Sequence, residues 1–171
     1  MKKKVFYPIA LLTVLLFTQS QCGPTTEDAM NYNDELIAEE LLVIDKINEL
    51  TDALSTYEPS NIEPALNSAK VQVDKSIKVL EEMGGFDGDT EFVDACMELF
   101  KLFKSQLNNE YTEQLEIYKL PIDQYTDVEE NRFNELNTII DDKYYPSFEK
   151  FSKTQEDFAE KWSFELGEAS Y

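Results

Sequence analysis

The stretch TEFVDACMELFKLFKSQLNNEYTEQLEIYKL, residues 90–120, decides the fold class. Its apolar side chains recur every three or four residues, the period of an α-helix with one buried face. They are Phe92, Cys96, Leu99, Phe103, Leu107, Tyr111, Leu115 and Tyr118. Charged and amide side chains fill most of the remaining positions. The stretch therefore predicts one long amphipathic helix, which Pro121 ends.

The same period recurs in three other segments, at residues 26–57, at 62–83 and from 126 to the end of the chain. Pro59 separates the first two segments, and Gly84 supplies a helix stop after the second. The last begins with a capping box, Thr126-Asp127-Val128-Glu129. Pro146 lies inside the last apolar stripe, which keeps its phase across the proline. A kink near Tyr144 and Tyr145 is therefore expected, and not a full break.

Four such helices with short connections predict an all-α protein, an elongated antiparallel four-helix bundle. The 171 residues divide into a signal peptide at 1–21, a tether at 22–28 and a single helical-bundle domain at 29–171. About 150 residues remain after the signal peptide, the size of one ordinary domain, and can build a core without a metal or a disulfide.

The N-terminus has the order of parts found in secretory signal peptides. Three lysines are followed by an apolar run at residues 5–17 and a polar run at 18–21. The apolar run is shorter than the roughly 20 residues that span a bilayer. Cys22 then stands where a bacterial lipobox places its lipid-bearing cysteine, although Gln19 and Gln21 depart from the usual pattern. Cleavage after Ser20 is the alternative, and a disulfide between Cys22 and Cys96 is a third interpretation.

Composition limits the function. The formal net charge is −20, from 15 basic and 35 acidic residues, so the surface repels nucleic acid. Cations, basic proteins and neutral ligands are compatible with it. The chain has no histidine, which excludes Ser-His-Asp and Cys-His catalysis and His-containing metal sites. We therefore expect no catalytic residue, no metal and no cofactor, and the chain is not expected to be an enzyme.

Three features of the sequence are candidate sites. Residues 87–91 place carboxylates at alternate positions, as calcium loops do, but a turn and a helix cap explain them better. Cys96 lies on an apolar stripe, which favours a core residue over a nucleophile. The aromatic run at 144–164 favours core packing over a pocket. Tyr145 and Phe164 fall off its stripe, so they are the candidate ligand contacts.

The chain resembles a family of small, uncharacterised helical surface lipoproteins of spirochaetes and Bacteroidetes. The likeness covers nearly the whole chain and is carried by four features. They are the export signal with Cys22, Asn31-Tyr32-Asn33-Asp34-Glu35, Gly85-Phe86-Asp87-Gly88-Asp89 and Phe158-Ala159-Glu160-Lys161. The resemblance implies a location at the cell surface and a helical shape, and it implies no catalytic residues.

The expected function is that of a non-enzymatic lipoprotein of the cell envelope with a binding or structural role. It is held to the membrane by lipid on Cys22, in the outer membrane or at the cell surface, and acts on an unknown protein or small-molecule partner. The alternative is a soluble periplasmic module that binds a small ligand in the bundle near the kinked fourth helix. An enzyme with a carboxylate-bound metal is the third reading.

Overall fold

The computed structural model describes residues 23–167, and this part of the chain is all-helical without named strands. The helices, in chain order, are α1 (Thr26–Leu54), α2 (Pro59–Met83), α3 (Glu91–Asn108), α4 (Glu110–Tyr118) and α5 (Asp127–Trp162). Within residues 23–167, no helix has both the length and the apolar character that crossing a membrane requires. The predicted signal peptide and Cys22 lie outside the described residues.

Side chains at the helix ends account for where the helices begin and stop. The predicted capping box opens α5. The backbone amide of Thr126 donates to the side chain of Glu129 at 2.9 Å, and the side chain of Thr126 accepts from the backbone amide of Glu129. A second box, Thr25 with Asp28, opens α1, so residues 26–28 belong to α1 and not to the tether. Gly84, with φ of +65°, follows α2 as predicted.

The single helix predicted at residues 90–120 is wrong in one respect, because it is interrupted at Asn109. Asn109 has φ of −116° and ψ of −81°, outside the helical region. Its side-chain amide donates to the carbonyl of Ser105 at 2.7 Å, and the hydroxyl of Thr112 donates to that of Leu107 at 2.7 Å. Such side chains compete with the backbone for its hydrogen bonds, and here they separate α3 from α4.

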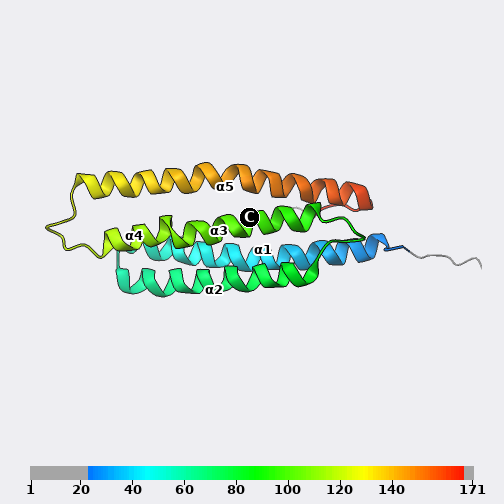
Figure 1. The fold of residues 1–171 in the computed structure, drawn as a ribbon, viewed down its shortest axis with the longest axis horizontal. Helices are drawn as coiled ribbons and strands as arrows, with labels where there is room; N and C mark the ends of the chain where they lie inside the picture. Colours follow the sequence, from blue (N-terminus) through cyan, green and yellow to red (C-terminus); the bar gives the residue numbers. More distant parts are fainter. Residues whose placement is uncertain (1–22, 168–171) are drawn as a thin grey trace, which may run out of the picture.

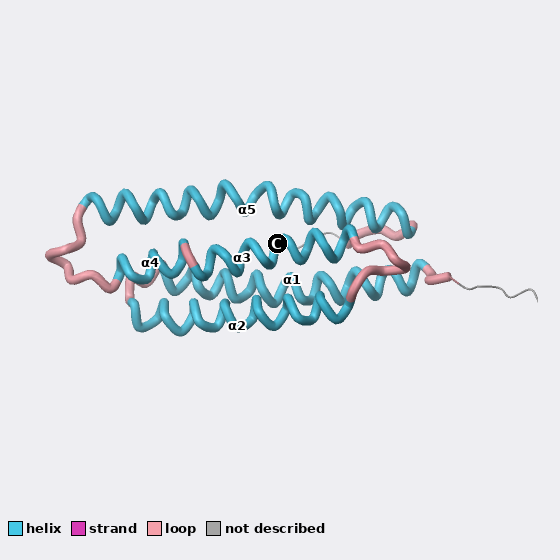
Figure 2. The backbone as a smooth tube through the Cα atoms, in the orientation of Figure 1, coloured by secondary structure: helices cyan, strands magenta, loops and turns pink. Residues whose placement is uncertain are grey.

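The helices lie side by side along the long axis of the molecule. The chain reverses direction between α1 and α2, between α2 and α3, and between α4 and α5 (Figure 1, Figure 2). The helix α1 packs closely on α2, α2 on α3, and α3 and α4 on α5, whereas α1 packs only loosely on α5. The start of α1, the connection from α2 to α3 and the end of α5 all lie at one end of the molecule (Figure 1).

An aromatic cluster fills that end. The ring of Phe86, from the connection, lies 4.9 Å from Trp162 and 5.7 Å from Phe158 on α5. Tyr32 of α1 lies 5.2 Å from Phe86, and its hydroxyl donates to the carbonyl of Gly84 at 2.7 Å. These edge-on and tilted pairs are favourable beyond the apolar area that they bury. They fasten α1, α5 and the connection together.

The helix α5 is the least buried element for its length. Only five of its 36 residues are buried, against nine of 18 in α3, so α5 is held by few core contacts. No residue between Ile140 and Phe151 is buried, and Pro146 lies in this interval. The helix continues through Pro146 without interruption and bows gently along its length in Figure 2. The kink stays a prediction.

The connection between α2 and α3 depends on Gly85. A methyl group at this position would lie 2.4 Å from the carbonyl oxygen of Asp89, which is fixed because it accepts from the amide of Phe86 at 2.8 Å. We expect Gly85→Ala to lower the free energy of unfolding by at least about 2 kcal/mol in chemical denaturation. The control is Gly167→Ala, whose added methyl meets no atom within 4 Å. Equal stability of the two variants would contradict the packing described.

Candidate functional site

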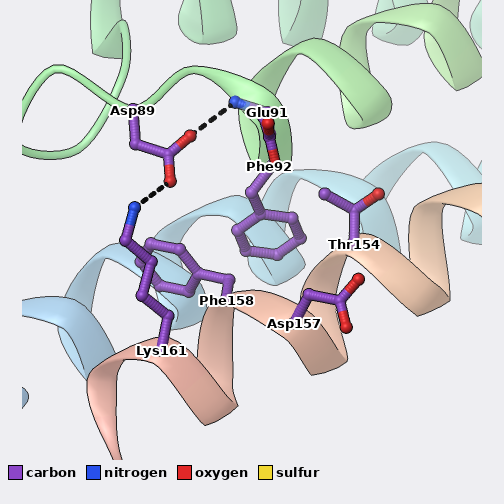
Figure 3. A pocket seen from close by; sticks show the side chains of 7 residues that line it. All are labelled: Asp89, Glu91, Phe92, Thr154, Asp157, Phe158 and Lys161. Atoms are coloured by element: carbon purple, nitrogen blue, oxygen red, sulfur yellow. Dashed lines mark hydrogen bonds and ion pairs between the residues drawn. The ribbon is translucent and has the colours of Figure 1, made fainter.

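A first hollow lies where α3 begins and α5 ends (Figure 3). It has a volume of about 280 Å³. Phe92 and Phe158 present their rings in it, and charged side chains surround them (Figure 3). The lining residues are Asp89, Glu91, Phe92, Thr154, Asp157, Phe158 and Lys161.

Two charged groups of this hollow, Asp89 and Lys161, pair with one another, and Asp157 pairs with Lys153 beside it. The two carboxylate oxygens of Asp89 accept from Lys161 at 2.6 Å and from the amide of Glu91 at 3.0 Å. These two hydrogen bonds hold the pKa of Asp89 below its ordinary value. Asp157 accepts from Lys153 at 2.7 Å. Thr90 occupies the N-cap position of α3, but it is the carboxylate of Asp89 that accepts from the first amide of the helix. This carboxylate therefore has little capacity left for a ligand.

The structure also describes the two other candidates from the sequence, the 87–91 loop as a metal site and Cys96 as a nucleophile. Among residues 23–167, no three His, Cys, Asp or Glu side chains are grouped so that they could hold a metal ion, and the 87–91 loop is included. Cys96 is a free thiol that is fully buried in the core, as the sequence predicted. Burial, followed by the charges of Glu40 and Glu39, raises the pKa of this thiol, which makes it a poor nucleophile.

A second pocket, which we call the seam pocket, opens where α1 packs loosely on α5. Its volume is about 190 Å³, and it lies beside the sparsely buried middle of α5. Residues of α1, α3, α4 and α5 line it. They are Ile44, Ile47, Asn48, Phe103, Gln106, Tyr111, Ile140, Asp141, Tyr144 and Tyr145.

Aromatic rings form much of the seam pocket. The ring centroid of Tyr144 lies 5.8 Å from that of Phe103 and 5.4 Å from that of Tyr145. Tyr145, a candidate contact from the sequence, lines this pocket and is 64 % exposed. Phe164, the other candidate, does not line it. Phe164 follows the end of α5, is only partly exposed and packs edge-on against Phe158 at 6.1 Å.

Gln106 is the polar residue of the seam pocket that sequence reasoning missed. It is 1 % exposed, and its amide nitrogen donates to the carbonyl of Ile140 at 3.0 Å. Its Oε1 is buried and has no hydrogen-bond partner among residues 23–167. An unpaired buried acceptor costs about 1–3 kcal/mol, so a donor that reached it would be favoured. The sequence contains a signal for the burial of Gln106, because this residue lies three positions after the core residue Phe103, on the same face of the helix.

Asp141 and Tyr111 add an electrostatic feature to the same pocket. Tyr111 is buried, and its pKa is raised to about 12, chiefly by burial and then by the negative charge of Asp141. None of the described residues that line the pocket is basic. The charged groups of the seam pocket are therefore negative.

Comparison of the chain with protein-family models, with curated proteins and with solved structures gave no match. The resemblance to helical surface lipoproteins therefore stays a prediction.

A buried carboxyl group lies in the core, close enough to Cys96 for its charge to act on that thiol. Glu40 of α1 is 2 % exposed, occupies the face that carries Leu36 and Val43, and has one carboxyl oxygen without a partner in the described residues. Burial raises its pKa from 4.5 to about 7. The neutral acid is therefore the form that the fold favours.

This raised pKa predicts a loss of stability as the pH rises. Between pH 4.5 and 7 the unfolded chain releases the proton of Glu40 while the folded chain retains it, so the free energy of unfolding falls. Glu40→Gln cannot ionise. We expect its stability relative to the native chain to rise by about 3 kcal/mol between pH 4.5 and pH 8, measured by urea denaturation.

The control for this experiment is Glu35→Gln, which removes one charge from an exposed position of the same helix. Its stability relative to the native chain should change little over the same range. If the Glu40→Gln difference were equally flat, Glu40 would not be shielded from water.

Proposed function

We propose that the chain is a non-enzymatic binding protein of the cell envelope. In this proposal, lipid on Cys22 anchors an antiparallel four-helix bundle that takes a small ligand in the seam pocket. The observation that carries the proposal is a pocket with aromatic walls that Gln106 lines, since the buried Oε1 of this side chain has no hydrogen-bond partner among residues 23–167. A pocket with a few placed polar groups among aromatic side chains is the usual form of a ligand site.

The anchor is proposed from the order of the N-terminal segments and from the place of α1. The helix begins at Thr26, only a few residues after Cys22, at the end that carries the aromatic cluster. Lipid on Cys22 would hold this end near a membrane. At 1.5 Å per residue, the 36 residues of α5 extend about 54 Å, so the other end would project away from the lipid.

The proposal does not include catalysis, because Ser-His-Asp and Cys-His mechanisms need a histidine. There is no histidine, and burial makes the thiol of Cys96 a poor nucleophile. Ligand binding is preferred to a purely structural role because a rod that only spaces two bodies apart needs no pocket. The outer membrane or the cell surface is the proposed location, and a soluble periplasmic form of the same binding module is the alternative.

The anchor can be tested by labelling cells with an alkyne analogue of a fatty acid. We expect the native protein to carry the label and Cys22→Ala to lose it, since the lipid is attached to that thiol. Cys96→Ala is the matched control, because it removes the other cysteine and should keep the label. A labelled Cys22→Ala protein would disprove the anchor, and an unlabelled native protein that is still exported would favour the soluble form.

The pocket can be tested by a fragment screen on the purified mature chain. We expect binders to shift the backbone amide NMR signals of residues 44–48 and 141–145. Tyr145→Ala should weaken binding by several-fold, because it removes an aromatic wall. Val71→Ala is the control, since Val71 is exposed on α2 and does not line the pocket. The site would be rejected if a screen of cationic, neutral and anionic fragments shifted none of these signals.

A further inference from the structure

We propose that the ligand of the seam pocket is a small organic ammonium ion, a primary amine carried on an aromatic or aliphatic body. This inference rests on the proposed function, since it names the chemistry of the molecule that the same pocket would bind. Three features of the pocket carry it, and they are its unused acceptor, its uncompensated charge and its aromatic faces.

The unused acceptor is Oε1 of Gln106. The amide nitrogen of this side chain donates to the carbonyl of Ile140 at 3.0 Å, which sets the orientation of the amide group. Its oxygen is left buried without a donor from residues 23–167. A ligand that satisfies this oxygen must bring an N–H or O–H group. A carboxylate or a phosphate brings none.

The uncompensated charge is that of Asp141. Nearby basic side chains are engaged elsewhere, since Lys143 pairs with Glu110 at 2.7 Å and Lys46 pairs with Glu49 at 2.5 Å. Within residues 23–167, no ion pair involves Asp141. Its charge reaches the pocket wall, because it is one of the causes that raise the pKa of Tyr111. A cation in the pocket would be attracted by this carboxylate, and an anion would be repelled.

The aromatic faces favour the same charge. Phe103, Tyr144 and Tyr145 line the pocket, and the faces of such rings attract ammonium groups. The net charge of −20 adds a long-range field that concentrates cations near the surface. A neutral alcohol could satisfy Gln106, but it would gain nothing from Asp141 or from these rings.

The volume of the pocket limits the size of the ligand. Engineered apolar cavities of about 150 Å³ accept benzene, and the seam pocket measures about 190 Å³. One ring or a short alkyl chain with an amine therefore fits it. The apolar body would contact Ile44, Ile47 and the aromatic rings. The ammonium group would then be free to donate to Gln106 or to Asp141.

Three probes that differ mainly in charge test this inference. They are 2-phenylethylamine, which is protonated at neutral pH, 2-phenylethanol, which has the same ring and chain length, and 3-phenylpropanoate, which is an anion. We expect isothermal titration of the purified mature chain at neutral pH and low salt to rank them in that order. The amine should bind at least about tenfold more tightly than the alcohol, because only the amine pairs with the carboxylate.

A matched pair of variants shows whether the charge acts at the pocket. Asp141→Asn should weaken binding of the amine about tenfold and leave binding of the alcohol almost unchanged. Asp142→Asn is the control, because Asp142 is exposed as Asp141 is but does not line the pocket. It should have little effect on either probe.

The outcomes separate this inference from the proposed function. If the alcohol or the anion binds as tightly as the amine at the seam pocket, or if Asp141→Asn and Asp142→Asn have equal effects, the ligand class is overturned while the pocket keeps its function. If none of the three probes binds and the broader fragment screen also leaves the signals of residues 141–145 unmoved, both are overturned. Preferential binding of the amine that depends on Asp141 supports both.

Discussion

The structure depends on one constraint, which is that each helix has a single apolar face and must bury it against the others. Among the four longer helices, α3 meets this constraint most fully, because half of its residues are buried and it packs on α2 and α5. The long helix α5 meets it least. Its apolar residues are widely spaced, and none between Ile140 and Phe151 is buried. The packed helices therefore have one weak side, where α1 and α5 share few contacts, and the seam pocket opens on this side.

The two ends of α5 and its middle are held in different ways. The aromatic cluster around Phe86 and Trp162 fixes the last turns, and Arg132 fixes the first turns through two hydrogen bonds to Glu113 of α4, at 2.7 and 2.9 Å. The middle has Pro146, which cannot donate a backbone hydrogen bond, and half-buried rings. The ion pairs of Lys143 with Glu110 and of Lys150 with Glu98 hold this middle part at the surface, while few of its side chains reach the core. In the proposed function, a ligand would enter beside this sparsely buried part.

The sequence could predict the helices because their period, caps and stops are local signals. Thr126 with Glu129 and Gly84 are examples, and both occur where they were expected. The interruption at Asn109 was missed because it depends on hydrogen bonds to Ser105 that compete with an otherwise unbroken apolar stripe. Tyr145 was predicted as a contact because it falls off the stripe. Gln106 and Asp141 were missed because their importance depends on which helix lies opposite, and periodicity within one helix does not contain that information.

Native-state hydrogen exchange, resolved by residue, tests most directly whether this side of the bundle is weak. Amides that open with few core contacts exchange through local fluctuations, whereas core amides exchange only when the whole chain unfolds. We expect the amides of residues 141–150 to exchange with a clearly lower opening free energy than those of residues 96–103 in α3. If both segments exchanged only through global unfolding, α5 would be held as firmly as the core, and a loose seam that admits a ligand would be contradicted.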